Sequence, residues 1–181
     1  SPSHQATTTQ ATPLPHRLSV QPDLSKVQSA VLEIPDIQAE ILSRGQKYSF
    51  DIIEHKRRRA TKQECASLVL KGPADIVYVT CRHFADGHPF AYEERLINVA
   101  AVPEVVDVDF SATPPGTWLL GHVPWTEAEH RIMALNAGPE YAKGLRVHAD
   151  TACLLVERRT WRAGQTITFV KQIFPGSLYY L

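Results

Sequence analysis

IVYVTCRHFADGHPF (residues 76–90) and CLLVERRTWRAGQTI (residues 153–167) decide the fold, because each indicates two apolar strands joined at a glycine turn. A shift of 77 residues superimposes the two stretches and brings their turn glycines, Gly87 and Gly164, into coincidence. A helix-like segment precedes each hairpin, so the pattern favours a duplicated α-β-β unit. Two such units predict an antiparallel sheet of at least four strands in an α+β domain.

The turn of the first hairpin predicts which of its side chains share a face. A three-residue loop, Ala85-Asp86-Gly87, pairs residues whose numbers add to 172, which places Cys81 opposite Ala91. Alternate residues of a strand point to the same face, so the odd-numbered side chains of both strands gather on one face. The chemically interesting members of this set are Cys81, His83, Glu93 and Arg95.

The same loop in the second hairpin adds further polar groups to that face. Residues whose numbers add to 326 are then paired, so Arg158 lies opposite Thr168 and Thr160 shares their face. Arginine binds a carboxylate through two hydrogen bonds and glutamate accepts N–H groups, so this set suits a small anion or zwitterion. A solvated face, or ion pairs without a ligand, fits equally well. A two-residue turn would place Arg82 and Arg159 on this face instead.

The flanking segments supply the other elements. Asp36 begins a short helix that Gly45 ends, and Thr61-Lys62-Gln63-Glu64 is a capping box for another helix. Residues 48–59 between them indicate a strand, and its basic end, Lys56-Arg57-Arg58-Arg59, suits a solvated strand end better than a phosphate site.

Segment 123–136 is ambiguous. Thr126-Glu127-Ala128-Glu129 resembles a capping box and favours a helix, whereas the apolar residues after it allow a strand.

Composition limits the class of protein. The 181 residues suit one domain, and 19 basic residues balance 19 acidic ones, which argues against a dedicated nucleic-acid-binding module. We find no apolar run long enough to span a membrane and no secretory signal, so we expect a cytoplasmic protein. Residues 1–30 are expected to form a flexible tail or linker, leaving 31–181 as the folded domain.

Metal, cofactor and catalytic chemistry have no direct support in the sequence. Cys65, Cys81 and Cys153 are odd in number and far apart, so we expect buried thiols rather than disulfides. Cys81 and His83 form one close pair, too few for a structural zinc site, so no metal is expected. No nucleophile elbow or phosphate-binding loop occurs, so we expect no enzyme and no cofactor.

Five segments, in order and spacing, resemble the effector-binding (UTRA) domain of GntR-type bacterial transcription regulators, in particular the branch that represses histidine utilisation. These segments are LEIPDIQAEILSRG (32–45), RHFADGHPFAYEERLINVAAVPE (82–104), PWTEAEHRIMA (124–134), CLLVERRTWRAGQTITFV (153–170) and FPGSLYYL (174–181). The resemblance implies a chorismate-lyase-like fold with a six-stranded antiparallel sheet, helices on one face and a ligand between them. It also implies that segment 123–136 is a strand.

The resemblance implies partners as well. Such proteins are usually homodimers, and a winged helix-turn-helix domain, which this sequence lacks, normally precedes the effector domain. DNA would be bound only through that domain, and the effector would release it allosterically from the operator. The alternatives that stay open are a chorismate-lyase-like enzyme, a sensor of a different small carboxylate, and a dimerisation module without a ligand.

The resemblance also suggests a ligand. Relatives that sense sugar phosphates carry two arginines at the positions of Cys81 and His83, so their loss here puts a phosphorylated ligand in doubt. The effector of the histidine-utilisation branch is urocanate, which has an imidazole ring and a carboxylate. Glu93 would accept the imidazole N–H, Arg95 or Arg158 would bind the carboxylate, and His83 would bind either end. Two aromatic side chains, Trp118 and Phe174, would stack on the ring. The expected ligand-binding residues are Cys81, His83, Glu93, Arg95, Trp118, Arg158, Thr160, Thr168 and Phe174.

Overall fold

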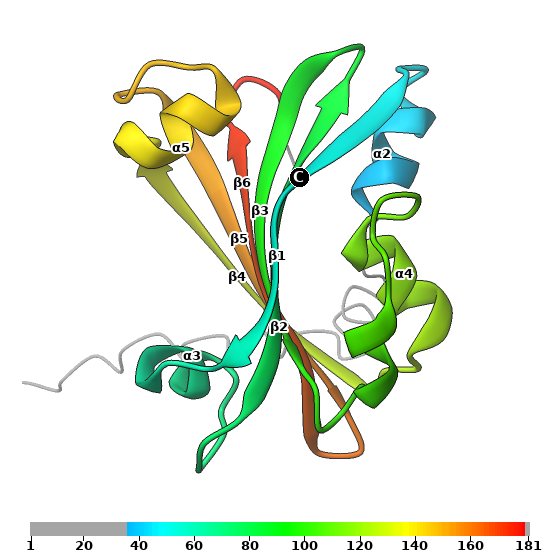
Figure 1. The fold of residues 1–181 in the computed structure, drawn as a ribbon. Helices are drawn as coiled ribbons and strands as arrows, with labels where there is room; N and C mark the ends of the chain where they lie inside the picture. Colours follow the sequence, from blue (N-terminus) through cyan, green and yellow to red (C-terminus); the bar gives the residue numbers. More distant parts are fainter. Residues whose placement is uncertain (1–35, 180–181) are drawn as a thin grey trace, which may run out of the picture.

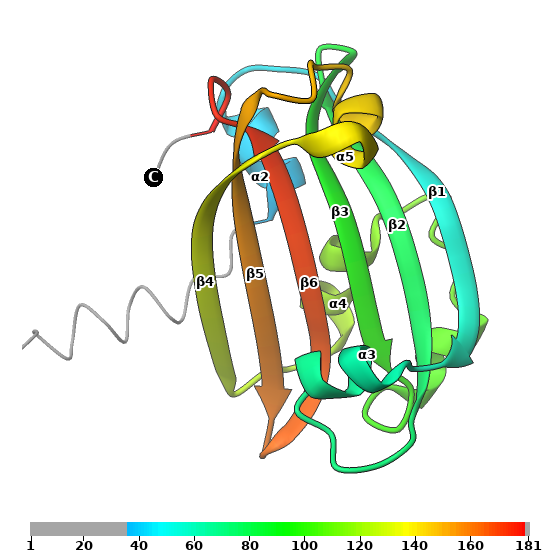
Figure 2. The ribbon, with the colours of Figure 1, turned by 90° about the vertical axis from the view of Figure 1, so that its left-hand side faces the viewer.

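The computed structural model describes residues 36–179. Within them, six strands form one antiparallel sheet in the order β1-β2-β3-β6-β5-β4, as Figures 1 and 2 show. The strands are β1 (Tyr48–Arg59), β2 (Asp75–Ala85), β3 (His88–Asn98), β4 (Glu127–Asn136), β5 (Ala152–Arg162) and β6 (Gln165–Pro175). The expected tail, residues 1–30, and the start of the expected domain, residues 31–35, lie outside the described residues.

The sheet order reflects the predicted duplication. The two hairpins, β2–β3 and β5–β6, lie side by side at the centre through the pairing of β3 with β6. The remaining strands, β1 and β4, form the two edges, so each half of the sheet contributes three strands in mirrored positions. The predicted α+β class and the six-stranded antiparallel sheet are therefore confirmed.

The hairpin turns differ from the prediction. Ala85 pairs with His88, so the loop has two residues, Asp86 and Gly87, both with positive φ (50° and 78°). Two positive φ values are typical of the tight turn whose twist matches that of the strands. The second hairpin turns in the same way at Ala163 and Gly164, with φ of 49° and 78°. The three-residue loops were therefore wrong in both hairpins.

A β-bulge near each turn then shifts the register by one residue. It lies between His83 and Phe84 in the first hairpin and between Thr160 and Trp161 in the second, again 77 residues apart. A bulge opposes two residues of one strand to one of its partner, which restores the predicted parity of the faces.

The predicted partners are nevertheless wrong. Cys81 lies opposite Glu93 rather than Ala91, and Thr168 lies opposite Thr160 rather than Arg158. The predicted polar residues still share one face of the sheet, because the bulge offsets the shorter turn.

Helices flank both faces of the sheet (Figure 1). Helices α2 (Ile37–Ser43) and α4 (Pro115–His122) lie on one face, together with the 3-10 helix η1 (Pro103–Asp107). Helices α3 (Lys62–Ser67) and α5 (Gly138–Leu145) lie on the other face, where α5 packs against β3. The expectation of helices on one face is therefore too narrow, since it holds only for the layer that faces the predicted polar cluster.

Local signals explain where the helices begin and end. The Asp36 carboxylate accepts a hydrogen bond from the backbone N–H of Gln38 and caps α2, and Gly45 follows the helix with a φ of 72°. The capping box predicted at Thr61 and Glu64 is present at the start of α3. None of the helices in residues 36–179 combines the length and hydrophobicity that a membrane-spanning helix needs.

The ambiguous segment forms strand β4, as the family resemblance implied. The Thr126 hydroxyl accepts a hydrogen bond from the backbone N–H of Ala163 and caps no helix. Tertiary context overrides the capping-box pattern here, because all ten residues of this segment pair with β5 in the sheet.

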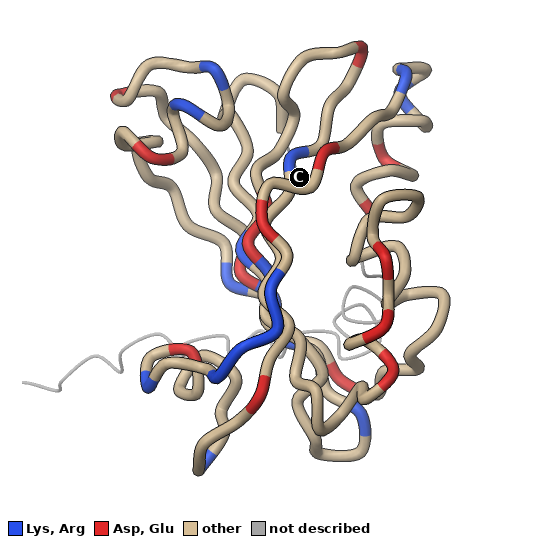
Figure 3. Tube along the Cα trace, viewed as in Figure 1, with Lys and Arg blue, Asp and Glu red and all other residues tan. Residues whose placement is uncertain are grey.

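Figure 3 marks the basic run at the end of β1 in blue, and most of this run is exposed to solvent, as expected. The side chains of Arg57 and Arg59 are 57% and 71% exposed, close to the Asp75 carboxylate. Arg58 instead forms an ion pair with Glu64 of the capping box.

Candidate functional site

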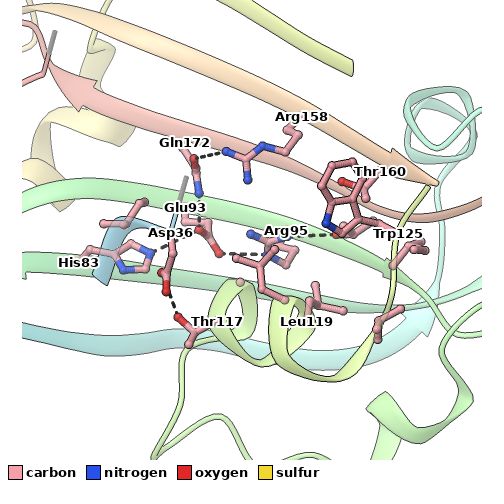
Figure 4. Close-up of a pocket in the computed structure, with 16 residues that line it drawn as sticks. Asp36, His83, Glu93, Arg95, Thr117, Leu119, Trp125, Arg158, Thr160 and Gln172 are labelled. Carbon is pink, nitrogen blue, oxygen red and sulfur yellow. Dashed lines mark hydrogen bonds and ion pairs between the residues drawn. The ribbon is translucent and has the colours of Figure 1, made fainter. Parts of the chain in front are cut away.

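A cavity lies between the polar face of the sheet and helices α2 and α4 (Figure 4). The cavity volume is about 40 Å³, which is room for a few waters. Six of the residues predicted for the site line it: His83, Glu93, Arg95, Arg158, Thr160 and Thr168. The four central strands supply all six, because the bulges keep their side chains on one face.

Glu93 forms the centre of a buried network. Its Oε1 atom accepts a hydrogen bond from Nε2 of Gln172 at 2.9 Å and lies 3.3 Å from Nε2 of His83. Its Oε2 atom accepts from Nε of Arg95 at 3.1 Å. Burial alone would raise the pKa of the Glu93 carboxyl, but Arg95, His83 and Gln172 together hold it well below its usual range. Glu93 is therefore a buried carboxylate anion whose two oxygens are already engaged.

Two arginines face this carboxylate, and only one is neutralised by it. Arg95 forms an ion pair with Glu93 and donates a hydrogen bond to the Thr168 hydroxyl at 3.3 Å. Arg158 is 5% exposed, and its Nη2 atom donates only to the neutral amide oxygen of Gln172, at 3.5 Å. Its Nε atom has no hydrogen-bond partner among the described residues.

Arg158 thus carries a positive charge that no described carboxylate neutralises. Burial, and then repulsion from Arg95, lower the pKa of Arg158 to about 10, which still leaves the guanidinium protonated at neutral pH. Because Glu93 and Arg95 cancel, the cluster of Glu93, Arg95 and Arg158 has a net charge of +1. A buried charge without a partner is costly, and an anion placed beside it would remove that cost.

Helices α2 and α4 close the cavity from the other side. The Asp36 carboxylate, at the start of α2, accepts a hydrogen bond from the Thr117 hydroxyl of α4 at 3.1 Å and lines the cavity (Figure 4). A Cβ atom on Gly116 would lie 3.0 Å from the Arg95 guanidinium, so α4 approaches the arginine closely. Leu119 of α4 and Trp125 beyond it add an apolar wall.

The structure does not bring the other three predicted residues into the lining. Cys81 lies beside it, with Sγ at 3.6 Å from Nε2 of His83 and 3.7 Å from Oε2 of Glu93. Trp118 stacks on His122, with ring centroids 4.7 Å apart, and belongs to the core under α4. Phe174 stacks on Tyr179 at 4.1 Å. Trp118 and Phe174 therefore lie outside the cavity lining and pack in the core, and their contact with a ligand stays a prediction.

The sequence interpretation missed several lining residues: Asp36, Gly116, Thr117, Leu119, Trp125 and Gln172. One of them had a signal, since Gln172 lies 77 residues after Arg95, the shift that superimposes the hairpins. Asp36 was identified only as the start of a helix. The position of α4 depends on packing across the domain, which no local pattern encodes.

Comparison with known proteins gives a consistent picture. Residues 43–180 match the family model described as the UTRA domain. Over 156 residues the chain is 33% identical to the histidine utilization repressor of Klebsiella aerogenes and 32% identical to that of Pseudomonas putida. Each alignment covers 86% of this chain, which spans only 65% and 63% of those two repressors.

Solved structures of two related domains have the same fold as this chain. The C-terminal domain of the histidine utilization repressor from Pseudomonas syringae pathovar tomato superimposes with a TM-score of 0.69 and 28% identity, covering 75% of this chain and 96% of that domain. The effector domain of PhnF from Mycobacterium smegmatis superimposes with a TM-score of 0.71 over 81% of this chain and 92% of that domain. At 13% identity, the latter match supports the fold alone.

Proposed function

This chain belongs to the UTRA domain family, and we propose on that premise that it is the effector-binding part of a transcriptional repressor of histidine utilisation. The relatives from Klebsiella aerogenes and Pseudomonas putida are named repressors, not enzymes, which speaks against the chorismate-lyase-like alternative. The effector we propose is urocanate, a small molecule with a carboxylate at one end and an imidazole ring at the other.

The single observation that carries this proposal is the guanidinium of Arg158, which no carboxylate of residues 36–179 neutralises. It is buried, protonated and directed at the cavity, and the hydroxyls of Thr160 and Thr168 lie on the same face. A carboxylate bound there would gain charge-assisted hydrogen bonds and cancel the net charge of the cluster. Arg158 therefore binds the effector carboxylate, while Arg95 stays paired with Glu93.

The opposite end of the cavity carries hydrogen-bond acceptors. Asp36 uses its Oδ1 atom for both of its hydrogen bonds, to Gln38 and Thr117, which leaves Oδ2 for a ligand. The oxygens of Glu93 are already engaged by its neighbours. We therefore propose that Asp36 accepts the hydrogen bond from the imidazole N–H. Glu93 instead positions Arg95 and Gln172. His83 contacts the ring between them.

Calorimetric titration with urocanate tests the proposal. Three ligands separate its parts: urocanate, its methyl ester, in which the carboxylate is masked, and histidine, whose ammonium group would meet the arginines. We expect saturable binding of urocanate near one molecule per chain, little binding of the ester, and weaker binding of histidine. Binding of the ester as tight as that of the acid would contradict the role of Arg158.

Two further outcomes of this titration decide between the alternatives. Chromatography of the mixture should recover urocanate unchanged, because conversion would mark an enzyme. Binding of another small carboxylate in preference to urocanate would keep the sensor and change its effector.

The regulatory mechanism we propose connects the cavity to the start of the domain. Asp36 caps the N-terminus of α2 and contacts α4 through Thr117, so an effector bound to it would act on the side of the domain from which a preceding DNA-binding domain would be attached. Effector binding would then shift a homodimer in the cytoplasm from its DNA-binding geometry to another. Hydrogen exchange should show that urocanate protects α2 and α4 more than β1, and sedimentation should show a dimer.

A further inference from the structure

Three side chains beside the cavity form a compact group that effector binding does not fully use. Cys81 comes from β2, His83 from the same strand two residues later, and Glu93 from the opposite position on β3. All three are at least 96% buried. One ligand atom from each lies within 4.8 Å of the others.

The spacing of these three side chains is compatible with a metal site. Sγ of Cys81 lies 3.6 Å from Nε2 of His83 and 3.7 Å from Oε2 of Glu93, and the imidazole nitrogen lies 3.3 Å from Oε1 of Glu93. Zinc binds sulfur at about 2.3 Å and nitrogen or carboxylate oxygen at about 2.0 Å in a tetrahedron, which requires ligand atoms about 3.3–3.6 Å apart. The sulfur and the imidazole nitrogen are already at such a distance, each contacts one oxygen of Glu93, and one ligand atom from each residue lies within 4.8 Å of the others, so a small rotation of the carboxylate would complete three corners of the tetrahedron.

The surroundings meet the other requirements of a metal site. The second nitrogen of His83, Nδ1, lies 2.8 Å from the Tyr48 hydroxyl, which fixes the ring and leaves Nε2 for a metal. Arg95 and Gln172 each donate to a different oxygen of Glu93 and hold the carboxylate in place, and an ion would replace only the contacts that these oxygens make with His83 and Cys81. His83 and Glu93 line the cavity, so an ion has an entry path and its fourth position faces the cavity.

We propose that Cys81, His83 and Glu93 form a Zn²⁺-binding site with its fourth coordination position open to the cavity. A thiolate and an imidazole nitrogen favour zinc over magnesium or calcium, which prefer oxygen ligands. On binding, the Cys81 thiol releases its proton to solvent as the sulfur–zinc bond forms, and His83 binds as the neutral ring.

The ion changes the charge of the cavity wall. Zinc adds two positive charges, and the loss of the thiol proton removes one. The net charge of the three ligands and the neighbouring arginines therefore rises by one. An anion in the cavity and the metal should therefore strengthen each other's binding by the same factor. This last step rests on the proposed function, whereas the metal site itself does not.

Titration of the whole chain with Co²⁺ tests the site without any effector. Cobalt replaces zinc in tetrahedral sites and reports a sulfur ligand by a charge-transfer band in the near ultraviolet. After treatment with a chelator and a reductant, we expect this band, together with the visible bands of four-coordinate cobalt, to saturate at one ion per chain and to disappear on addition of Zn²⁺. Absence of the charge-transfer band would overturn the proposal and leave the three side chains joined by hydrogen bonds alone.

The three cysteines provide matched controls. Cys81→Ser should abolish the charge-transfer band, whereas Cys65→Ser and Cys153→Ser should keep it. Tyr48→Phe, which keeps the ring but removes the hydroxyl behind His83, should weaken Co²⁺ binding by about 10–100-fold. A band that survives Cys81→Ser would also overturn the site.

One measurement needs no variant and remains decisive if Cys81→Ser does not fold. X-ray absorption of the zinc-loaded wild-type chain should show one sulfur among nitrogen and oxygen ligands, and a shell without sulfur would overturn the proposal. The urocanate titration should therefore be performed with a chelator present, so that failure of the metal site and failure of the proposed function give different results.

Discussion

Arg95 and Arg158 flank the same residue, Val170, which pairs with Arg95 on β3 and with Arg158 on β5. The two guanidinium groups thus approach one cavity from either side of β6. Only Arg95 has a carboxylate partner among the described residues, and this asymmetry leaves Arg158 for a ligand.

Replacing Arg158 by methionine separates binding from stability. Arg158→Met keeps much of the apolar volume but removes an unneutralised buried charge, so the free energy of unfolding should stay the same or rise. Urocanate should bind about 10–100-fold more weakly, since hydrogen bonds to charged groups contribute about 1.5–3 kcal/mol. Calorimetry and urea unfolding measure the two quantities.

The neighbouring arginine is the matched control. Arg159 points to the other face, where it donates to the Ser67 carbonyl and pairs with Glu129. Arg159→Met should lower stability and leave urocanate affinity unchanged. Equal effects of the two substitutions on affinity would argue against the role of Arg158.

The buried Glu93 predicts a loss of stability in acid. Burial raises its pKa, but Arg95 and His83 outweigh burial, so the folded pKa lies well below the usual value near 4.5. A depressed folded pKa contributes stability that is fully present above the unfolded pKa and is lost as the pH falls below about 4.5 towards the folded value. Urea unfolding at a series of pH values should show this decline.

Glu93→Gln tests the same group directly. It leaves Arg95 and Arg158 both buried without an anion, which should destabilise the domain by about 3–5 kcal/mol at neutral pH. The variant should also lose part of the acid dependence. An unchanged slope of stability against pH below 4.5 would show that other carboxyl groups cause the decline.

Two glycines at the seventh position of their helices should respond oppositely to alanine. A Cβ atom on Gly144 in α5 would lie 2.6 Å from Cδ2 of Tyr92, whereas one on Gly121 in α4 meets nothing within 4 Å. Gly144→Ala should therefore cost about 1–3 kcal/mol through overpacking, and Gly121→Ala should stabilise by up to about 1 kcal/mol through helix propensity.

A second substitution identifies the cause of the Gly144 effect. Replacing Tyr92 by leucine in the Gly144→Ala background should recover part of the lost stability, because the clash involves the ring edge. No recovery in thermal or urea unfolding would mean that the backbone, not the tyrosine, resists the added methyl group.

The sequence predicted the strands and the polar face well, for a physical reason. Alternation along β2 and β5 and the matched glycines at 87 and 164 are local signals that survive in the fold. Turn length, in contrast, was predicted wrongly in both hairpins. Asp86 and Ala163 adopt positive φ, which few non-glycine residues do, and the compensating bulges leave no residue signature. Two errors cancelled, so the face was right while the partners were wrong.

Local sequence patterns could not predict which residues of α4 and the segment after it line the cavity. Trp118 and Trp125 both follow the Pro-Pro-Gly segment, and nothing in their neighbours shows which one faces the sheet. In the structure, Trp118 packs with Phe110 in the core and Trp125 lines the cavity. Only the docking of α4 against the sheet decides between them.

Tryptophan fluorescence turns this distinction into a test of where the effector binds. Trp125 is half-buried in the cavity wall, so a planar ring bound near it should quench its emission, whereas Trp118 is not among the lining residues and packs on Phe110 and His122. Urocanate should quench the fluorescence of wild type and Trp118→Phe alike, and Trp125→Phe should lose most of the change.

Excitation at the red edge of tryptophan absorption, with free tryptophan as a reference, corrects for absorption by urocanate. Quenching that disappears with Trp118→Phe and persists with Trp125→Phe would place the effector under the core side of α4, because only a ligand on that side contacts the Trp118 ring.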